Sequence, residues 1–112
     1  MDLDGLDALA TGLDGVRRTT RDGLARWQYD GRLVVREVDA RTIVVRVPFD
    51  VRALLLAAHP AVFAVPQRYA RHMMVVAYLD APDPATDDAV EDAVVAAWRL
   101  QRAQGRGESG LT

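Results

Sequence analysis

The architecture of this chain follows most directly from residues 26–38, whose sequence is RWQYDGRLVVREV. The first four residues alternate polar and aromatic side chains, which is typical of a half-buried strand. Asp30-Gly31 follows, a dipeptide that tolerates the positive φ angles of a type I′ turn. The apolar run after this turn predicts a second strand, so the whole stretch predicts an antiparallel hairpin.

The segments on either side of this hairpin predict a sheet between helices. Further strands are expected at residues 16–21, 42–47 and 73–79. Helices are expected at residues 3–13, 51–58 and 84–104. Asp50 and Asp83 are the expected N-caps of the second and third helices. Strands clustered between terminal helices predict an α+β two-layer sandwich, an antiparallel sheet flanked by N- and C-terminal helices.

The length and composition are those of one domain. The chain has 112 residues, half of them hydrophobic, and its lack of cysteine excludes disulfides, thiolate metal sites and a cysteine nucleophile. No apolar run approaches the ~18 residues of a membrane span, and the acidic start lacks the positive charge of a secretory signal. We expect a cytoplasmic protein with no membrane partner. The domain is expected to cover residues 1–104, followed by a flexible Gly-rich tail over 105–112.

The sequence carries no recognisable catalytic or metal-binding motif. His59 and His72 have no carboxylate at ligand spacing. Ser109, the only serine, lies in the expected tail, and a chain without lysine cannot contain a Walker motif. We therefore expect no enzyme activity, no cofactor and no metal.

The basic residues are unevenly distributed along the chain. All 14 are arginine, which is typical of a GC-rich genome, and the net charge of −2 by itself argues against a nucleic-acid partner. However, residues 16–79 hold eleven arginines and five acidic residues, a net charge of +6, whereas residues 1–15 and 80–112 each have −4. The expected strands are therefore basic and the terminal helices acidic.

Alternation along the strands predicts an arginine-rich sheet face. The expected core face consists of Leu33, Val35, Ile43, Val45 and Val47. The opposite face is then expected to carry Arg32, Val34, Arg36, Thr42, Val44 and Arg46. Arginine matches phosphate in a bidentate manner, although an uncovered sheet face also needs charges for solubility alone.

A second cluster precedes the strand expected at 73–79. It consists of Arg68, Tyr69, Arg71 and His72. Loops with such a mixture often hold binding residues, but a structural tyrosine between exposed arginines has the same sequence. A small-ligand pocket formed by Trp27, Tyr69 and His72 is a further hypothesis.

An ordered series of motifs resembles the MmcQ/YjbR family over residues 6–102. These motifs are Trp27 with 30–33, and residues 42–47, 52–60, 63–69, 72–76 and 97–100. The resemblance implies a CyaY-like α+β fold and DNA binding through a double-wing arrangement of hairpins. Arg32 stands where many relatives have lysine, His72 replaces a tyrosine-proline type of sequence, and Leu33-Val34 replaces a common aromatic residue.

The leading hypothesis is a DNA-binding module that contacts phosphates weakly and in a salt-dependent manner. Its expected contact residues are Arg32, Arg36, Arg46, Arg68, Tyr69, Arg71 and His72. One alternative is a protein-interaction module, in which the acidic helix of one copy pairs with the basic sheet of another. The other is a small-ligand-binding domain around the Trp27 pocket. A CyaY-like fold also raises iron binding by Asp2, Asp4 and Asp7.

Overall fold

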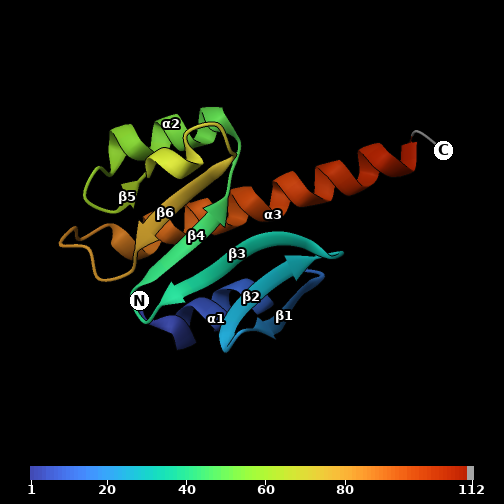
Figure 1. The fold of residues 1–112 in the computed structure, drawn as a ribbon, viewed down its shortest axis with the longest axis horizontal. Helices are drawn as coiled ribbons and strands as arrows, with labels where there is room; N and C mark the ends of the chain where they lie inside the picture. The colour runs from blue at the N-terminus through green and yellow to red at the C-terminus, as the bar shows by residue number, and fades with distance from the viewer. Residues whose placement is uncertain (111–112) are drawn as a thin grey trace.

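The computed structural model describes the backbone of residues 1–110 and the side chains of residues 1–105. The helices are α1 (Leu3–Thr11), α2 (Phe49–Ala58), the 3₁₀ helix η1 (Gln67–Tyr69) and α3 (Thr86–Gly110) (Figure 1). The strands are β1 (Val16–Arg21), β2 (Leu24–Tyr29), β3 (Arg32–Asp39), β4 (Thr42–Arg46), β5 (Phe63–Ala64) and β6 (Met74–Tyr78). They form one antiparallel sheet in the order β1-β2-β3-β4-β6-β5, with α1 and α3 packed on it. This confirms the α+β sandwich.

Two tight turns join the first three strands, and the one at Asp30-Gly31 is the turn that the sequence predicts. The φ angles are 54° and 78° in Asp22-Gly23, and 50° and 75° in Asp30-Gly31. Positive φ at both central residues defines a type I′ turn, whose twist matches that of the flanking strands. The two Asp-Gly dipeptides therefore place β1, β2 and β3 side by side.

A β-bulge in β3 changes which of its side chains face the helices. Trp27 is opposite Val35, but Gln28 is opposite Leu33, so Val34 is an extra residue in the ladder. Val34 and Val35 are both buried in the core, whereas Leu33 is only half-buried. The predicted core face was therefore wrong at Leu33, and the predicted opposite face was wrong at Val34, because strict alternation ends at a bulge.

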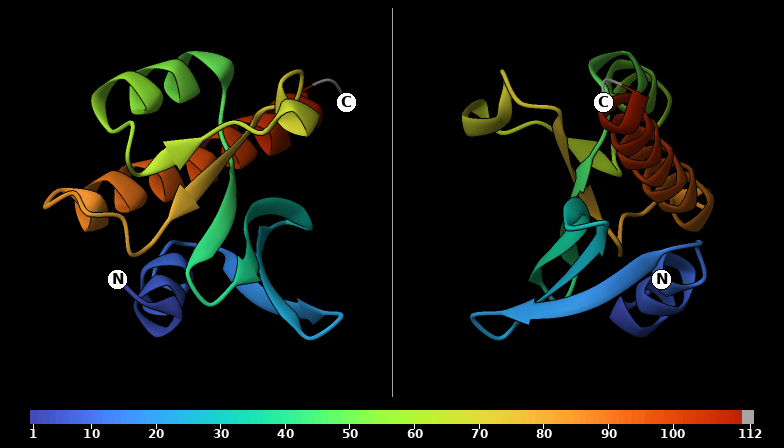
Figure 2. Two further views of the ribbon diagram at one scale, coloured as in Figure 1. Left: turned by 60° about the vertical axis from the view of Figure 1, so that its left-hand side comes forward. Right: turned by 90° about the vertical axis from the view of Figure 1, so that its right-hand side faces the viewer.

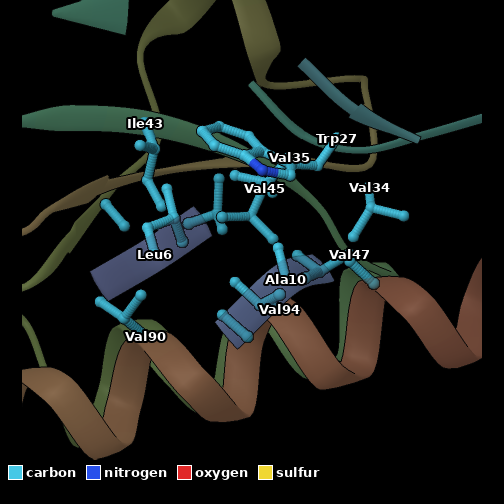
Figure 3. Close-up of a cluster of buried hydrophobic side chains, with 14 of the residues drawn as sticks. Leu6, Ala10, Trp27, Val34, Val35, Ile43, Val45, Val47, Val90 and Val94 are labelled. Atoms are coloured by element: carbon cyan, nitrogen blue, oxygen red, sulfur yellow. The ribbon is translucent and has the colours of Figure 1, made fainter. Parts of the chain in front are cut away.

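The hydrophobic core lies between one face of the sheet and helices α1 and α3 (Figure 3). Leu6 of α1 and Val94 of α3 are fully buried in it. Trp27 is 1% exposed, and its indole N–H donates to Asp7 Oδ1 at 2.8 Å. The leucine face of α1 therefore packs into the core, which compensates for Gly5, a residue that weakens this short helix.

The helix boundaries differ from the predicted ones. α2 begins at Phe49 behind Pro48, so Asp50 is not its N-cap. Asp83 lies in the turn before α3, where its carboxylate accepts the Ala85 N–H at 2.8 Å. The expected tail at 105–112 is helical as far as Gly110, and residues 111–112 lie outside the described residues. No helix in the described part of the chain is long and apolar enough to span a membrane.

The second face of the sheet points away from α1 and α3, and we call it the uncovered face. In the right panel of Figure 2, the yellow η1 segment and the blue turn between β1 and β2 both project on this side. Val44 and Val76 are buried here but lie outside the core cluster. The uncovered face therefore lies between two projecting elements.

Candidate nucleic-acid interface

The pairing of the strands brings five arginines to the uncovered face. One row across the sheet consists of Thr19, Arg26, Arg36 and Val44, each directly opposite the next. Side chains two positions apart on a strand point to the same face. Three more arginines therefore join this row: Arg17, Arg21 and Arg46. We call these five residues the arginine face.

Within residues 1–105, the arginine face has no carboxylate partner. Among residues 1–105, none of its five guanidiniums forms an ion pair. β1, β2 and β4 contain no acidic residue, and Glu37 on β3 uses Oε1 to accept the Ala25 N–H at 3.0 Å. Like charges directly opposite each other on neighbouring strands are destabilising. Repulsion between Arg26 and Arg36 is therefore expected to lower the free energy of unfolding.

Two hollows lie along the ribbon that β1 and β2 form. One, of about 240 Å³, lies beside the β1–β2 turn and is lined by Arg21, Arg26 and Arg36 with Asp22, Leu24 and Glu37. The other, of about 420 Å³, includes Arg17, Thr19 and Gln28 in its lining. Four of the five residues of the arginine face therefore border a concave surface.

Tyr69 connects the η1 segment to the arginine face. Arg36 Nη2 donates to the Tyr69 hydroxyl at 2.5 Å, and the Arg68 guanidinium lies 4.8 Å from the centre of the Tyr69 ring. Hydrogen bonding to Arg68 is the largest cause that lowers the pKa of Tyr69 below its usual 10.0, and the charges of Arg36 and Arg68 act in the same direction. The structure thus brings together two predicted clusters that are 33 residues apart.

Arg52 of α2 fixes the segment that carries Tyr69. Its guanidinium donates to four backbone carbonyl groups at 2.8–3.3 Å, those of Tyr69, Ala70, His72 and Met74. A guanidinium holds its donors in a rigid planar fork, which suits several carbonyl acceptors at once. Sequence reasoning missed this residue because its partners are main-chain atoms 17–22 positions away.

Arg32 does not belong to the arginine face, so its predicted place was wrong. It is opposite Tyr29, which packs against the core. Its Nη1 lies 3.3 Å from Asp30 Oδ2, and 3.6 Å from where a Cβ on Gly105 of α3 would be. The extra residue Val34 puts Arg32 and Arg36 on opposite faces of β3.

The pocket hypothesis for Trp27, Tyr69 and His72 was also wrong. Trp27 is a core residue on the helix-covered face, whereas Tyr69 contacts Arg36 on the uncovered face. The sheet lies between them, and His72 is exposed in the segment after η1.

Apart from Arg32, the predicted nucleic-acid residues fall into two groups. Arg36 and Arg46 lie on the arginine face, and Arg68, Tyr69, Arg71 and His72 lie in or just after the projecting η1 segment. Arg17, Arg21 and Arg26 were missing from the predicted site. The sequence signal that could have identified them is their spacing along two strands that contain no acidic residue.

The described residues contain no candidate metal centre. No group of three or more His, Asp or Glu side chains among them is arranged to hold an ion. His59 Nδ1 lies 3.5 Å from Asp83 Oδ2, but these two groups have no third potential ligand among the described residues. Asp7 of α1 accepts the Trp27 N–H, and Asp2, the N-cap of α1, accepts the Gly5 N–H, so both have structural roles.

Comparison with known proteins adds no relative. No protein-family model matches the chain, and no curated protein matches it. The resemblance to the MmcQ/YjbR family therefore stays a prediction from the motifs, as does the absence of enzyme activity.

Proposed function

We propose that this chain is a nucleic-acid-binding module that contacts the phosphates of DNA with its arginine face. The observation that carries the proposal is the gathering of five guanidiniums from four adjacent strands, without an ion-pair partner in the described part of the chain. Guanidinium groups form bidentate, charge-assisted hydrogen bonds with phosphate oxygens. A regular row of phosphates would supply the negative charge that this face lacks.

The η1 segment supports the same proposal. It projects on the side of the arginine face (Figure 2) and holds Arg68, with Arg71 just after it. Both arginines are exposed and neither forms an ion pair with a described residue. We expect phosphate contacts rather than base-specific contacts, because the arginines come from strands and no helix presents a basic face for the major groove.

Fluorescence anisotropy with a short DNA duplex tests this function. We expect binding at about 50 mM salt that weakens steeply towards about 200 mM, because each neutralised phosphate contributes roughly −0.9 to the slope of log K against log salt. The double variant Arg26→Gln/Arg46→Gln should lower that slope by about 2. The matched control Arg41→Gln/Arg99→Gln removes two arginines outside this face and should bind like the parent. No binding at low salt, or binding indifferent to salt, would contradict the proposal.

Self-association is a second candidate, because the charges of the molecule are separated. The first turns of α3 carry four exposed acidic residues, Asp87, Asp88, Glu91 and Asp92. The arginine face is on the other side of the sheet, so pairing of the two would join copies head to tail. Sedimentation at low and high salt distinguishes the candidates. A monomer at both salt concentrations removes self-association.

A further inference from the structure

The hollow beside the β1–β2 turn gathers guanidiniums from three adjacent strands. Arg21, Arg26 and Arg36 come from β1, β2 and β3. Its volume of about 240 Å³ is below the roughly 300–1,000 Å³ of sites that enclose drug-sized ligands. The hollow therefore suits one small charged group rather than a whole ligand.

The charges around the hollow favour an anion. Arg26 and Arg36 are directly opposite each other on strands about 4.8 Å apart, and no described carboxylate forms an ion pair with either. Asp22 and Glu37 also line the hollow, so its three arginines exceed its two carboxylates by one positive charge, and Glu37 Oε1 already accepts the Ala25 N–H. An anion between the guanidiniums would turn a repulsive pair into two attractive contacts.

One side of the hollow is fixed before any ligand arrives. Tyr69 accepts one N–H of Arg36, and Arg52 ties the segment of Tyr69 to α2 through four carbonyl groups. A guanidinium has five N–H donors, so Arg36 keeps donors for a ligand. Binding then costs less side-chain entropy than it would at a free surface arginine.

We infer that this hollow takes a phosphomonoester, the terminal phosphate of a nucleic-acid strand. A phosphomonoester has three free oxygens and a charge of about −1.5 to −2 at neutral pH. A phosphodiester within a strand has two free oxygens and a single charge. Three arginines around one hollow offer one guanidinium for each of the three free oxygens of the first group, which a phosphodiester cannot use fully. The inference rests on the proposed function, because it assumes that the neighbouring arginines bind the rest of the strand.

The test compares oligonucleotides of equal total charge. One probe carries a terminal phosphate at its 5′ end and another carries it at its 3′ end. The third ends in hydroxyl groups and is lengthened until its internucleotide phosphates match the charge of the others. We expect one phosphorylated probe to bind about tenfold tighter than the hydroxyl-ended probe, the equivalent of one charge-assisted hydrogen bond.

Variants connect this preference to the hollow. Arg21→Gln and Arg26→Gln should bind the phosphorylated and hydroxyl-ended probes equally, whereas Arg41→Gln, an arginine of the β3–β4 turn, should keep the preference. Circular dichroism confirms that each variant is folded. Equal affinity of the parent for all three probes, or a preference that survives Arg26→Gln, would overturn the inference.

The failures of the inference and of the proposed function are distinguishable. Salt-dependent binding without an end preference overturns the inference and leaves the proposed function intact. If no oligonucleotide binds but adenosine 5′-monophosphate raises the melting temperature of the parent and not of Arg26→Gln, the proposed function fails. The hollow is then a phosphomonoester site for a free small molecule. If neither oligonucleotide nor monophosphate binds, both are overturned.

Discussion

The arginines on the two faces of this sheet differ in whether a carboxylate lies beside them. On the helix-covered face, Arg18 lies 3.7 Å from Asp7 and Arg32 lies 3.3 Å from Asp30. On the uncovered face, Arg26 and Arg36 are opposite each other and neither has an ion-pair partner in residues 1–105. On the covered face, carboxylates neutralise the charges of these arginines at the edge of the apolar core. On the uncovered face, no described carboxylate neutralises the charges of Arg26 and Arg36. The proposed DNA binding rests on this unneutralised positive charge.

The largest effect on stability is expected on the covered face, from Trp27→Ala. Removing this buried indole should lower the free energy of unfolding by about 3–5 kcal/mol, because it leaves a cavity in the core and removes the hydrogen-bond donor to Asp7 Oδ1. Chemical denaturation measures the change. Leu54→Ala, at a side chain that is 71% exposed, is the control and should change it by less than about 0.5 kcal/mol. Equal losses in the two variants would refute this location of the core.

The next largest effect is expected where Arg52 joins α2 to the η1 segment. Arg52→Met should cost about 1.5–3 kcal/mol and speed hydrogen exchange in residues 69–74, because four carbonyl groups lose a charged donor. Arg52→Lys should restore little, since an ammonium group cannot reproduce the planar fork. If the lysine variant exchanges as slowly as the parent, the fork geometry is not what fixes the segment.

A pair of matched substitutions tests the contrast between the faces directly. Arg26→Gln should raise the free energy of unfolding by about 0.2–1 kcal/mol, because it removes a repulsive cross-strand pair. Arg18→Gln should lower it by about 0.2–1 kcal/mol, because it removes the exposed ion pair with Asp7. Arg26→Gln should also weaken DNA binding. Changes of the same sign in both variants would show that the two faces are electrostatically alike.

The smallest effect is the pH dependence contributed by Tyr69. Its pKa is lowered in the folded state, so its ionisation stabilises the fold fully above the usual pKa of 10.0. This contribution disappears as the pH falls through the lowered folded-state pKa, and near neutral pH it is absent. In an absorbance titration, Tyr69→Phe should remove a phenolate step that lies below pH 10.0 in the parent. An identical titration curve in the variant would show that Tyr69 is not perturbed.

The sequence was sufficient for every strand of the sheet except the two-residue β5, and only partly for the site. Arg36 and Arg46 were placed correctly because no irregularity lies between each of them and its buried neighbours Val35 and Val45. Arg32 was misplaced because the bulge at Val34 lies between it and the buried residue that anchors the pattern. This bulge lies in the pairing of β3 with β2, and no short sequence pattern specifies it.

Local preferences of the chain set the hairpins and the division of charge. Asp22-Gly23 and Asp30-Gly31 adopt positive φ because these residue types tolerate it, and that preference acts over a few bonds. The contact between Arg36 and Tyr69 has a different origin, since it requires Arg52 to hold a segment far along the chain against the sheet. Backbone preferences act between neighbouring residues, whereas packing and long-range hydrogen bonds exist only once the elements have met. The sequence alone therefore establishes that residues 16–79 carry a net positive charge. Only the folded sheet determines which of their arginines share a face.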